Sequence, residues 1–276
     1  MRSKQVMILT HESIGKYRSW CIARGQSPNT AKAYSTDLRM LLEFHETETI
    51  LSEDYEEMAQ TWLNETRAAA APKTTGRRLT SLRGFARWAN IETELSEYKA
   101  PTPGRPIPHP LPEGLEGLER LLRYTANHEQ NALVGCIGFI GLRVQEALDF
   151  HFTWLDTQSM ILRVRGKGDK ERFVPVSPRA WDSISTAFIH AMSSPDGKLI
   201  HYQDRSARKC ITTLGRKAGL QRAISSHDLR ATYATIMSNN GVPPRVIQEL
   251  LGHANLASTE IYTGVGVDSL KSAVNF

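Results

Sequence analysis

A proline-rich stretch between Lys99 and Pro112 limits what this chain can fold into more than any other feature. Prolines occupy positions 101, 103, 106, 108, 110 and 112. Proline has no backbone N–H and a fixed φ, so at this density the chain forms neither a helix nor a central strand and favours an extended conformation. The sequence therefore predicts a semi-rigid linker over residues 99–112, between a domain over 1–98 and a domain over 113–276.

The segment before this linker has the apolar spacing of helices. Ile14, Tyr17 and Cys21 recur at the helical period. Ser27 stands directly before a proline, which is typical of a helix N-cap followed by proline in the first turn. A third helix is expected over 75–89, with leucine and aromatic residues on its inner face. Residues 1–98 are therefore predicted to form a helical domain.

The helix expected over 75–89 lies in a basic part of the chain. Residues 67–87 contain no acid, whereas residues 46–57 contain several acids and no base. This contrast indicates one face made for phosphates and another kept away from them. The arginines expected on the outer face, where they would contact DNA, are Arg77, Arg78, Arg83 and Arg87. The alternative is a basic face that is only solvated.

The segment after the linker is mixed. Its composition predicts strands near 153–156, 159–165 and 171–176. Helices are expected over 113–126, 130–141, 143–150, 178–191, 205–218, 226–239, 243–251 and 257–263. The predicted fold class is mainly α with a small β-sheet (α+β).

Composition excludes several classes of protein. The net charge of +5 over 276 residues permits a polyanionic partner without requiring one. The three cysteines are far apart and the histidines form no cluster with metal-ligand spacing, so we expect no disulfide framework, no metal and no cofactor. The longest apolar run, over 132–142, is too short to span a membrane, and residues 1–10 lack the features of a signal peptide. We therefore expect a cytoplasmic protein without a membrane partner.

An ordered set of polar side chains near the end of the chain indicates its chemistry. His227 and Arg230 are three residues apart, so they share one helix face, and His253 and Tyr262 follow. Arginine presents a planar, permanent charge that matches phosphate oxygens. A tyrosine hydroxyl can attack a phosphate when a base and fixed cations surround it. The set therefore indicates a site that holds a phosphodiester and attacks it covalently.

Two further basic residues lie upstream. Arg143 stands where a helix is expected to begin, a position at which backbone amides and the helix dipole favour an anion. Lys167 lies between two glycines in an expected hairpin turn, from which its ammonium can protonate a leaving oxygen. Taken alone, Arg143 would be a surface ion pair, Lys167 a solvated lysine like Lys170, and Tyr262 a packing residue. Their order along the chain favours the shared site.

In the order Arg, Lys, His-x-x-Arg, His and Tyr, this set resembles the tyrosine recombinase (phage integrase) family. The resemblance covers about residues 10–263, and all six motif positions match. It implies a catalytic domain with a three-stranded sheet and, over residues 1–98, a core-type DNA-binding domain of four or five helices. The catalytic set that it implies is Arg143, Lys167, His227, Arg230, His253 and Tyr262.

The resemblance also implies the role of each member of this set. Tyr262 would attack the scissile phosphate and form a 3′-phosphotyrosine, so neither a metal nor a nucleotide cofactor is required. Arg143 and Arg230 would clamp the non-bridging oxygens. His227 would accept the tyrosine proton, and His253 would donate a hydrogen bond to the same phosphate. Lys167 would serve as the general acid.

The layout resembles compact Xer-type recombinases or short phage integrases, without the arm-binding domain that many phage integrases carry. The implied function is integration, excision or resolution at paired core sites in double-stranded DNA. The implied assembly is a homotetramer on DNA and a monomer in solution, with room for an accessory DNA-bending protein. We expect the tail over 264–276 to dock on a neighbouring protomer rather than fold back. The implied setting is a bacterial or phage-infected cell.

Two other classes remain open. One is an enzyme that nicks and closes DNA without exchanging strands, like a type IB topoisomerase. The other is a catalytically silent DNA-binding protein that keeps the fold. The intact set of six residues argues against the second.

Overall fold

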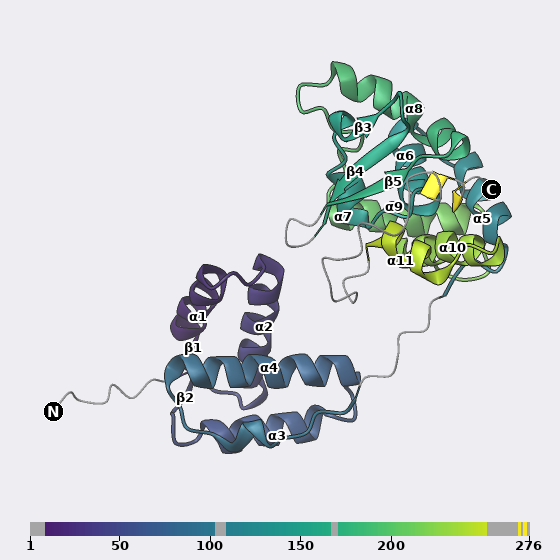
Figure 1. The fold of residues 1–276 in the computed structure, drawn as a ribbon. Coiled ribbons are helices and arrows are strands. Elements are labelled where there is room, and N and C mark those ends of the chain that lie inside the picture. The colour runs from purple at the N-terminus through teal and green to yellow at the C-terminus, as the bar shows by residue number, and fades with distance from the viewer. Residues whose placement is uncertain (1–8, 103–108, 167–170, 253–269, 272, 275–276) are drawn as a thin grey trace. The chain divides into compact units, whose positions relative to one another are not determined.

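The computed structural model describes residues 9–102, 109–166, 171–252, 270–271 and 273–274. The chain divides into two compact units, residues 1–106 and 107–276 (Figure 1). The division falls within the proline-rich stretch over 99–112. Each unit has its own apolar core and is described by itself.

The first unit is a bundle of helices with one small strand pair. Its elements are β1 (Leu9–Thr10), α1 (His11–Ala23), α2 (Pro28–Phe44), β2 (Thr49–Ile50), α3 (Tyr55–Thr66), α4 (Pro72–Ala89) and the short 3-10 helix η1 (Glu94–Ser96). The strands β1 and β2 pair antiparallel. As expected, Ser27 caps α2 by accepting the backbone N–H of Thr30, with proline in the first turn.

Helix α3 corrects our residue-by-residue prediction, which assigned no helix to residues 55–66. Tyr55, Ala59, Trp62 and Leu63 are buried on one face of α3 and pack in the core of the unit. Their spacing is helical, but the acidic residues before and within this helix masked the signal. The arginine-bearing helix is therefore the fourth of the described helices and not the third.

The second unit combines a helical body with a three-stranded sheet. Its helices are α5 (Gly114–Arg123), α6 (His128–Gly138), α7 (Val144–Leu148), α8 (Pro178–Ser193), α9 (Asp204–Lys217), α10 (Ser226–Asn239) and α11 (Pro244–Leu251). Its strands are β3 (Leu155–Asp156), β4 (Ile161–Arg165) and β5 (Glu171–Pro175), which follow the 3-10 helix η2 (Phe152–Trp154). The fold class, mainly α with a small β-sheet, is confirmed.

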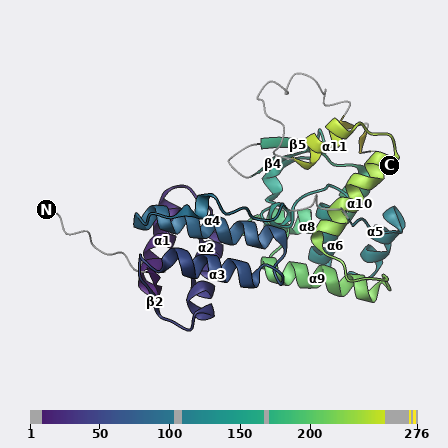
Figure 2. The ribbon, with the colours of Figure 1, turned by 90° about the horizontal axis from the view of Figure 1, so that it is seen from below.

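The most apolar helix, α6, lies at the centre of this unit. It packs against α8, α10 and α5, and seven consecutive residues from Ala132 to Gly138 are buried (Figures 1 and 2). The sheet has the order β3-β4-β5 with antiparallel pairing, and β5 packs against α11. Helix α6 thus fixes the start of α7 and one side of α10, from which two candidate site residues project.

Residues near both ends of the second unit pack into its core. Leu111, from the end of the proline-rich stretch, is buried in this core and its backbone N–H donates to Thr232 Oγ1 at 2.8 Å. Leu270 and Val274, from the tail, are buried in the same core. The described part of the tail therefore packs in cis, because its apolar side finds a surface on its own unit. The expected docking of this tail on a neighbouring protomer in the assembly on DNA stays a prediction.

Candidate active site

Arg143 stands at the start of α7, as the sequence predicted. Its backbone N–H donates to Glu146 Oε2 at 2.8 Å, and its Nη1 donates to Glu146 Oε1 at 2.7 Å. Glu146 thus caps the helix and holds the guanidinium of Arg143 at once. The side chain of Arg143 keeps 42% of its surface exposed, so the group remains accessible to a ligand.

Arg230 and His227 project from the first turns of α10. Ser225 and Asp228 form a capping box there, so Asp228 serves the helix start. His227 is exposed in the first turn, and Arg230 is buried one turn later. Arg230 Nη1 donates to the Gly141 carbonyl, and its Nη2 donates to the Leu251 carbonyl.

Arg172 is a third guanidinium in this site, and our sequence analysis missed it. The side chain lies on β5 and is only 10% exposed. Its Nη1 and Nη2 donate to the two carboxylate oxygens of Glu146 at 2.9 and 2.7 Å. The strand register held a signal: Arg172 and Val174 point inward while Phe173 is exposed, so a charge stands at a core position.

The last turn of α11 brings the three arginines together a second time. Arg172 Nε donates to the carbonyl of Leu250 at 2.9 Å, Arg230 donates to Leu251, and Arg143 Nη2 donates to Gly252 at 2.7 Å. These carbonyls have no partner within the helix, and they form the negative end of its dipole. Gly252 adopts a left-handed conformation with φ of 63°, which ends the helix directly before His253.

The charges in the site do not cancel. Among the described residues of the site, three guanidiniums face the carboxylate of Glu146, with Arg230 Nη1 at 3.9 Å from Glu146 Oε2. Burial raises the pKa of Glu146, but the hydrogen bonds and charge of Arg172, joined by those of Arg143, outweigh it and lower the pKa to about 2. Burial lowers the pKa of Arg230 to about 10, with the charge of Arg143 adding to the effect. The surplus positive charge suits a phosphodiester anion.

The structure brings together Arg143 and Arg230 from the predicted set and places His227 on the same helix as Arg230. Lys167, His253 and Tyr262 lie outside the described residues. Strands β4 and β5 pair up to Arg165 and Glu171 and so flank the segment that contains Lys167. The predicted helix over 257–263 also lies outside the described residues. Among the residues that are described, no group of histidine, cysteine or carboxylate side chains could hold a metal, and no helix is long and apolar enough to cross a membrane.

The four arginines expected to contact DNA through α4 have different surroundings. The expectation that Arg78 lies on the outer face is wrong: it is buried, with its Cζ 4.7 Å from the centre of the Trp62 ring. Arg77 Nη1 lies 2.7 Å from Asp37 Oδ2, and Arg83 donates to backbone carbonyls at the end of the unit. Arg87 is exposed and makes no hydrogen bond or ion pair within the described part of the chain.

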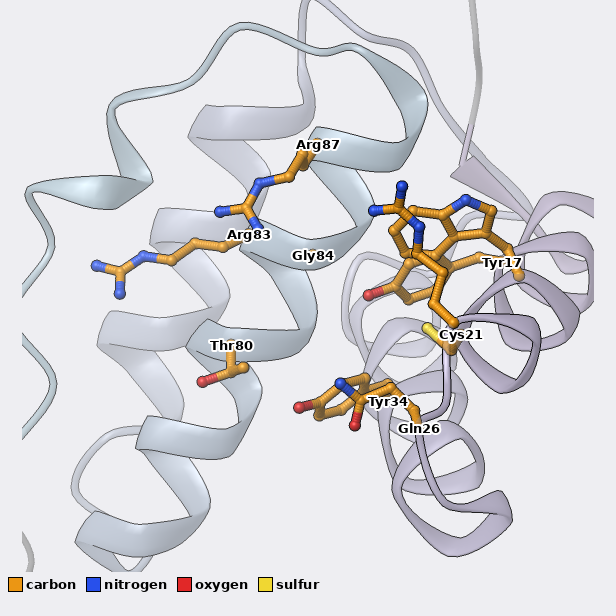
Figure 3. Close-up of a pocket in the computed structure, with 10 residues that line it drawn as sticks. Tyr17, Cys21, Gln26, Tyr34, Thr80, Arg83, Gly84 and Arg87 are labelled. Atoms are coloured by element: carbon orange, nitrogen blue, oxygen red, sulfur yellow. The ribbon is translucent and has the colours of Figure 1, made fainter. Parts of the chain in front are cut away.

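Arg87 and Arg83 line a cavity of about 380 Å³ between α1, α2 and α4. Figure 3 shows Gly84 of α4 opposite Tyr17 of α1, with Tyr34 of α2 below. A Cβ at Gly84 would lie 2.2 Å from the Tyr17 hydroxyl, so only glycine permits this approach. The cavity has no acidic residue in its lining, which is Tyr17, Trp20, Cys21, Arg24, Gln26, Tyr34, Thr80, Arg83, Gly84 and Arg87.

Family models match both units. The model described as the phage integrase family matches residues 116–267, and the model described as the phage integrase N-terminal SAM-like domain matches residues 17–93. Tyrosine recombinase XerC of Listeria welshimeri is 33% identical to this chain, over 90% of the chain and 91% of the relative. Tyrosine recombinase XerA of Thermococcus onnurineus is 29% identical, over 95% and 94%.

Solved structures share the fold. A lambda integrase dimer bound to a COC′ core site has a TM-score of 0.71 at 12% identity, with 92% of this chain and 77% of that chain covered. The XerH site-specific recombinase bound to difH substrate has a TM-score of 0.63 at 20% identity, with 87% and 79% covered. These likenesses show the fold, and the family models and the XerC relative show that the chain belongs to the phage integrase family of tyrosine recombinases.

Proposed function

We propose that this protein carries out site-specific DNA recombination by cutting and rejoining strands through a 3′-phosphotyrosine at Tyr262. The convergence of Arg143 and Arg230 carries the proposal. These two residues come from distant parts of the sequence, yet both guanidiniums lie beside Glu146 and both donate to the last turn of α11. Such a pair can hold the two non-bridging oxygens of one phosphate and stabilise the charge that develops on them.

The remaining members of the set act around this clamp. His227, exposed in the first turn of α10, accepts the proton of the Tyr262 hydroxyl as that oxygen attacks phosphorus. His253 directly follows Gly252, whose carbonyl Arg143 holds, and donates a hydrogen bond to the phosphate. Lys167 gives a proton to the leaving 5′-oxygen. The phosphotyrosine conserves the bond energy for rejoining, so the reaction uses no metal and no nucleotide.

The first unit contacts DNA through the cavity between α1, α2 and α4. Arg24 and Arg87 supply the positive charge here, since Arg77, Arg78 and Arg83 are engaged within the unit. The guanidinium of Arg24 stacks over the Trp20 ring, with its Cζ 4.8 Å from the ring centre. A stacked arginine is partly fixed and keeps its N–H groups for phosphate oxygens. The absence of acids in the lining favours the same partner.

The active assembly is a homotetramer on two paired core sites, formed from monomers in solution, with an accessory DNA-bending protein as an optional partner. Among the structures with this fold is a lambda integrase tetramer bound to a Holliday junction, with a TM-score of 0.69 and 15% identity. In this proposal the described tail residues, which pack in cis in the single chain, exchange to a neighbour when the tetramer forms. Integration, excision and resolution are all open to such an assembly.

The test is covalent capture with Tyr262→Phe. The substrate is a duplex with a site that the wild-type protein enriches from a random-sequence pool. A nick close to the cleavage position lets the short cut fragment diffuse away, so the strand cannot be rejoined. The wild type should form a protein–DNA adduct on a denaturing gel, with and without EDTA, and the variant should form none while binding the same duplex. An adduct in the variant would remove Tyr262 as the nucleophile. Relaxation of supercoiled DNA without recombinant product would instead indicate a nicking-closing enzyme.

A further inference from the structure

We propose that Arg172 is a positioning residue for the reaction: it holds Glu146 and the last turn of α11 so that Arg143 and Arg230 meet the phosphate at a fixed separation. The inference rests on the proposed function and adds a residue outside the six-member motif. Arg172 does not touch the phosphate in this proposal. It acts through Glu146 on one side and through the Leu250 carbonyl on the other.

All three nitrogens of the Arg172 guanidinium donate hydrogen bonds. Two nitrogens bind both oxygens of Glu146, and the third binds Leu250, with distances from 2.7 to 2.9 Å. Lysine has one nitrogen and cannot reproduce this planar, three-point geometry. With Arg172 and Glu146 both nearly buried, neither group can exchange its partner for water. The pair therefore sets one orientation of the carboxylate.

That orientation determines the place of both clamp arginines. The oxygen Oε1 that Arg172 Nη1 binds also accepts Arg143 Nη1, and the oxygen Oε2 that Arg172 Nη2 binds also accepts the Arg143 backbone N–H. Arg230 lies at 3.9 Å from Oε2 and donates to Leu251, the residue after the Leu250 that Arg172 holds. A rotation of the Glu146 carboxylate would move Arg143 directly and change the charge that faces Arg230.

Arg172 also joins β5 to the clamp. It is the second residue of β5, which pairs with β4. One side chain thus ties this strand to Glu146 of α7 and to the last turn of α11. A charged side chain in this role costs more to bury than an apolar one.

The matched control is Arg163 on the neighbouring strand. It also binds a carboxylate through a fork, with Nε and Nη2 at 2.9 and 2.7 Å from the oxygens of Glu171, but its side chain is 54% exposed. Arg172→Lys and Arg163→Lys therefore remove the same geometry, once beside the clamp and once away from it. Arg172→Gln serves as a second variant, which keeps two hydrogen-bonding atoms and removes the charge.

The experiment measures single-turnover cleavage of the nicked duplex at saturating protein, with affinity for the same duplex and thermal melting measured in parallel. Both Arg172 variants should cleave between about 10- and 100-fold more slowly than wild type, since small misplacements near a reacting centre have effects of this size. DNA affinity should stay unchanged, and Arg163→Lys should match wild type in every measurement. Cleavage is read well below the melting temperature of each variant.

Two modified substrates separate positioning from a purely structural role. A methylphosphonate at the scissile position removes one negative oxygen and lowers the demand on the clamp, so it should shrink the difference between wild type and the Arg172 variants. A 5′-bridging phosphorothiolate, whose leaving group needs no proton, should leave that difference unchanged. The proposal is overturned if Arg172→Lys cleaves like wild type, if its defect follows affinity or melting, or if the phosphorothiolate rescues it. Failure of wild type to form any adduct would refute the proposed function instead.

Discussion

Asp37 in the first unit and Glu146 in the second are both buried beside arginine, and the pKa values of these two carboxylates shift in opposite directions. In the first unit, Asp37 has Arg77 and the Ser81 hydroxyl as partners, and its Oδ1 has no hydrogen-bond partner among the described residues. Burial outweighs the charge of Arg77 and raises the pKa of Asp37. In the second unit, two arginines and a backbone N–H lower the pKa of Glu146 to about 2.

The difference lies in the number of donors and not in the depth of burial. The ion pair between Asp37 and Arg77 joins α2 to α4, and its two opposite charges leave little net charge at this place for a ligand. The cluster in the second unit keeps its carboxylate ionised and still carries surplus positive charge. Several arginines around one carboxylate can therefore hold the local structure together and still attract an anionic ligand.

The largest expected effect comes from removing one arginine partner of each of these two carboxylates. Arg143 and Arg77 are matched, with 42% and 38% of their side chains exposed and one contact of 2.7 Å each to the carboxylate. Arg143→Ala should lower single-turnover cleavage by about 100- to 1000-fold, because a donor to the developing charge is lost. Arg77→Ala should leave cleavage by bound protein unchanged. Equal cleavage rates in the two variants would refute the contrast.

Neutral isosteres of the two carboxylates should differ in stability. Glu146→Gln leaves Arg172 and Arg230 without their countercharge and should lower the free energy of unfolding of the second unit by about 3–5 kcal/mol. Asp37→Asn should cost the first unit far less at neutral pH, because burial already disfavours the ionised form. Denaturant melts of each variant, followed by hydrogen exchange in each unit, provide the comparison. A larger loss in Asp37→Asn would contradict it.

Acidification should affect the stability of the two units in opposite directions. The folded-state pKa of Glu146 is near 2 and its ordinary value is 4.5, so its stabilising effect is present above pH 4.5 and is lost as pH falls towards 2. The loss amounts to roughly 3 kcal/mol. Asp37 has a raised pKa, so its protonation on acidification favours the folded first unit. Hydrogen exchange between pH 5 and 2 should show the second unit opening first, and Glu146→Gln should flatten its pH dependence.

The smallest effect is expected from Arg24 and Arg87 of the first unit. Arg24→Ala and Arg87→Ala should each weaken DNA binding and reduce the slope of log affinity against log salt by about 1, the value for one lost phosphate contact. Arg83→Ala, a neighbour whose donors are held by backbone carbonyls, should leave the slope unchanged. Slopes measured by fluorescence anisotropy decide this. An altered slope for Arg83→Ala alone would reverse the assignment.

The sequence predicted the helices and strands better than the burial and partners of the charged side chains. The helix start at Ser27 was readable because caps are local. Arg143 and Arg230 were identified from their order in the motif. The burial of Arg78 and the role of Arg172 were not, because both depend on partners far away in sequence: Trp62 and Thr66 for the first, Glu146 and Leu250 for the second.

The close approach of Gly84 to Tyr17 has a consequence for how this surface can vary between relatives. The spacing of α1 and α4 depends on a side chain that is absent, since any Cβ at position 84 would meet the phenol oxygen at 2.2 Å. A larger residue there would push the two helices apart and carry Arg24 and Arg87 with them. A single substitution at position 84 would thus change the distance between the two arginines that we propose to contact DNA, while both arginines stay in place. In this proposal, target preference changes through a residue that carries no charge of its own.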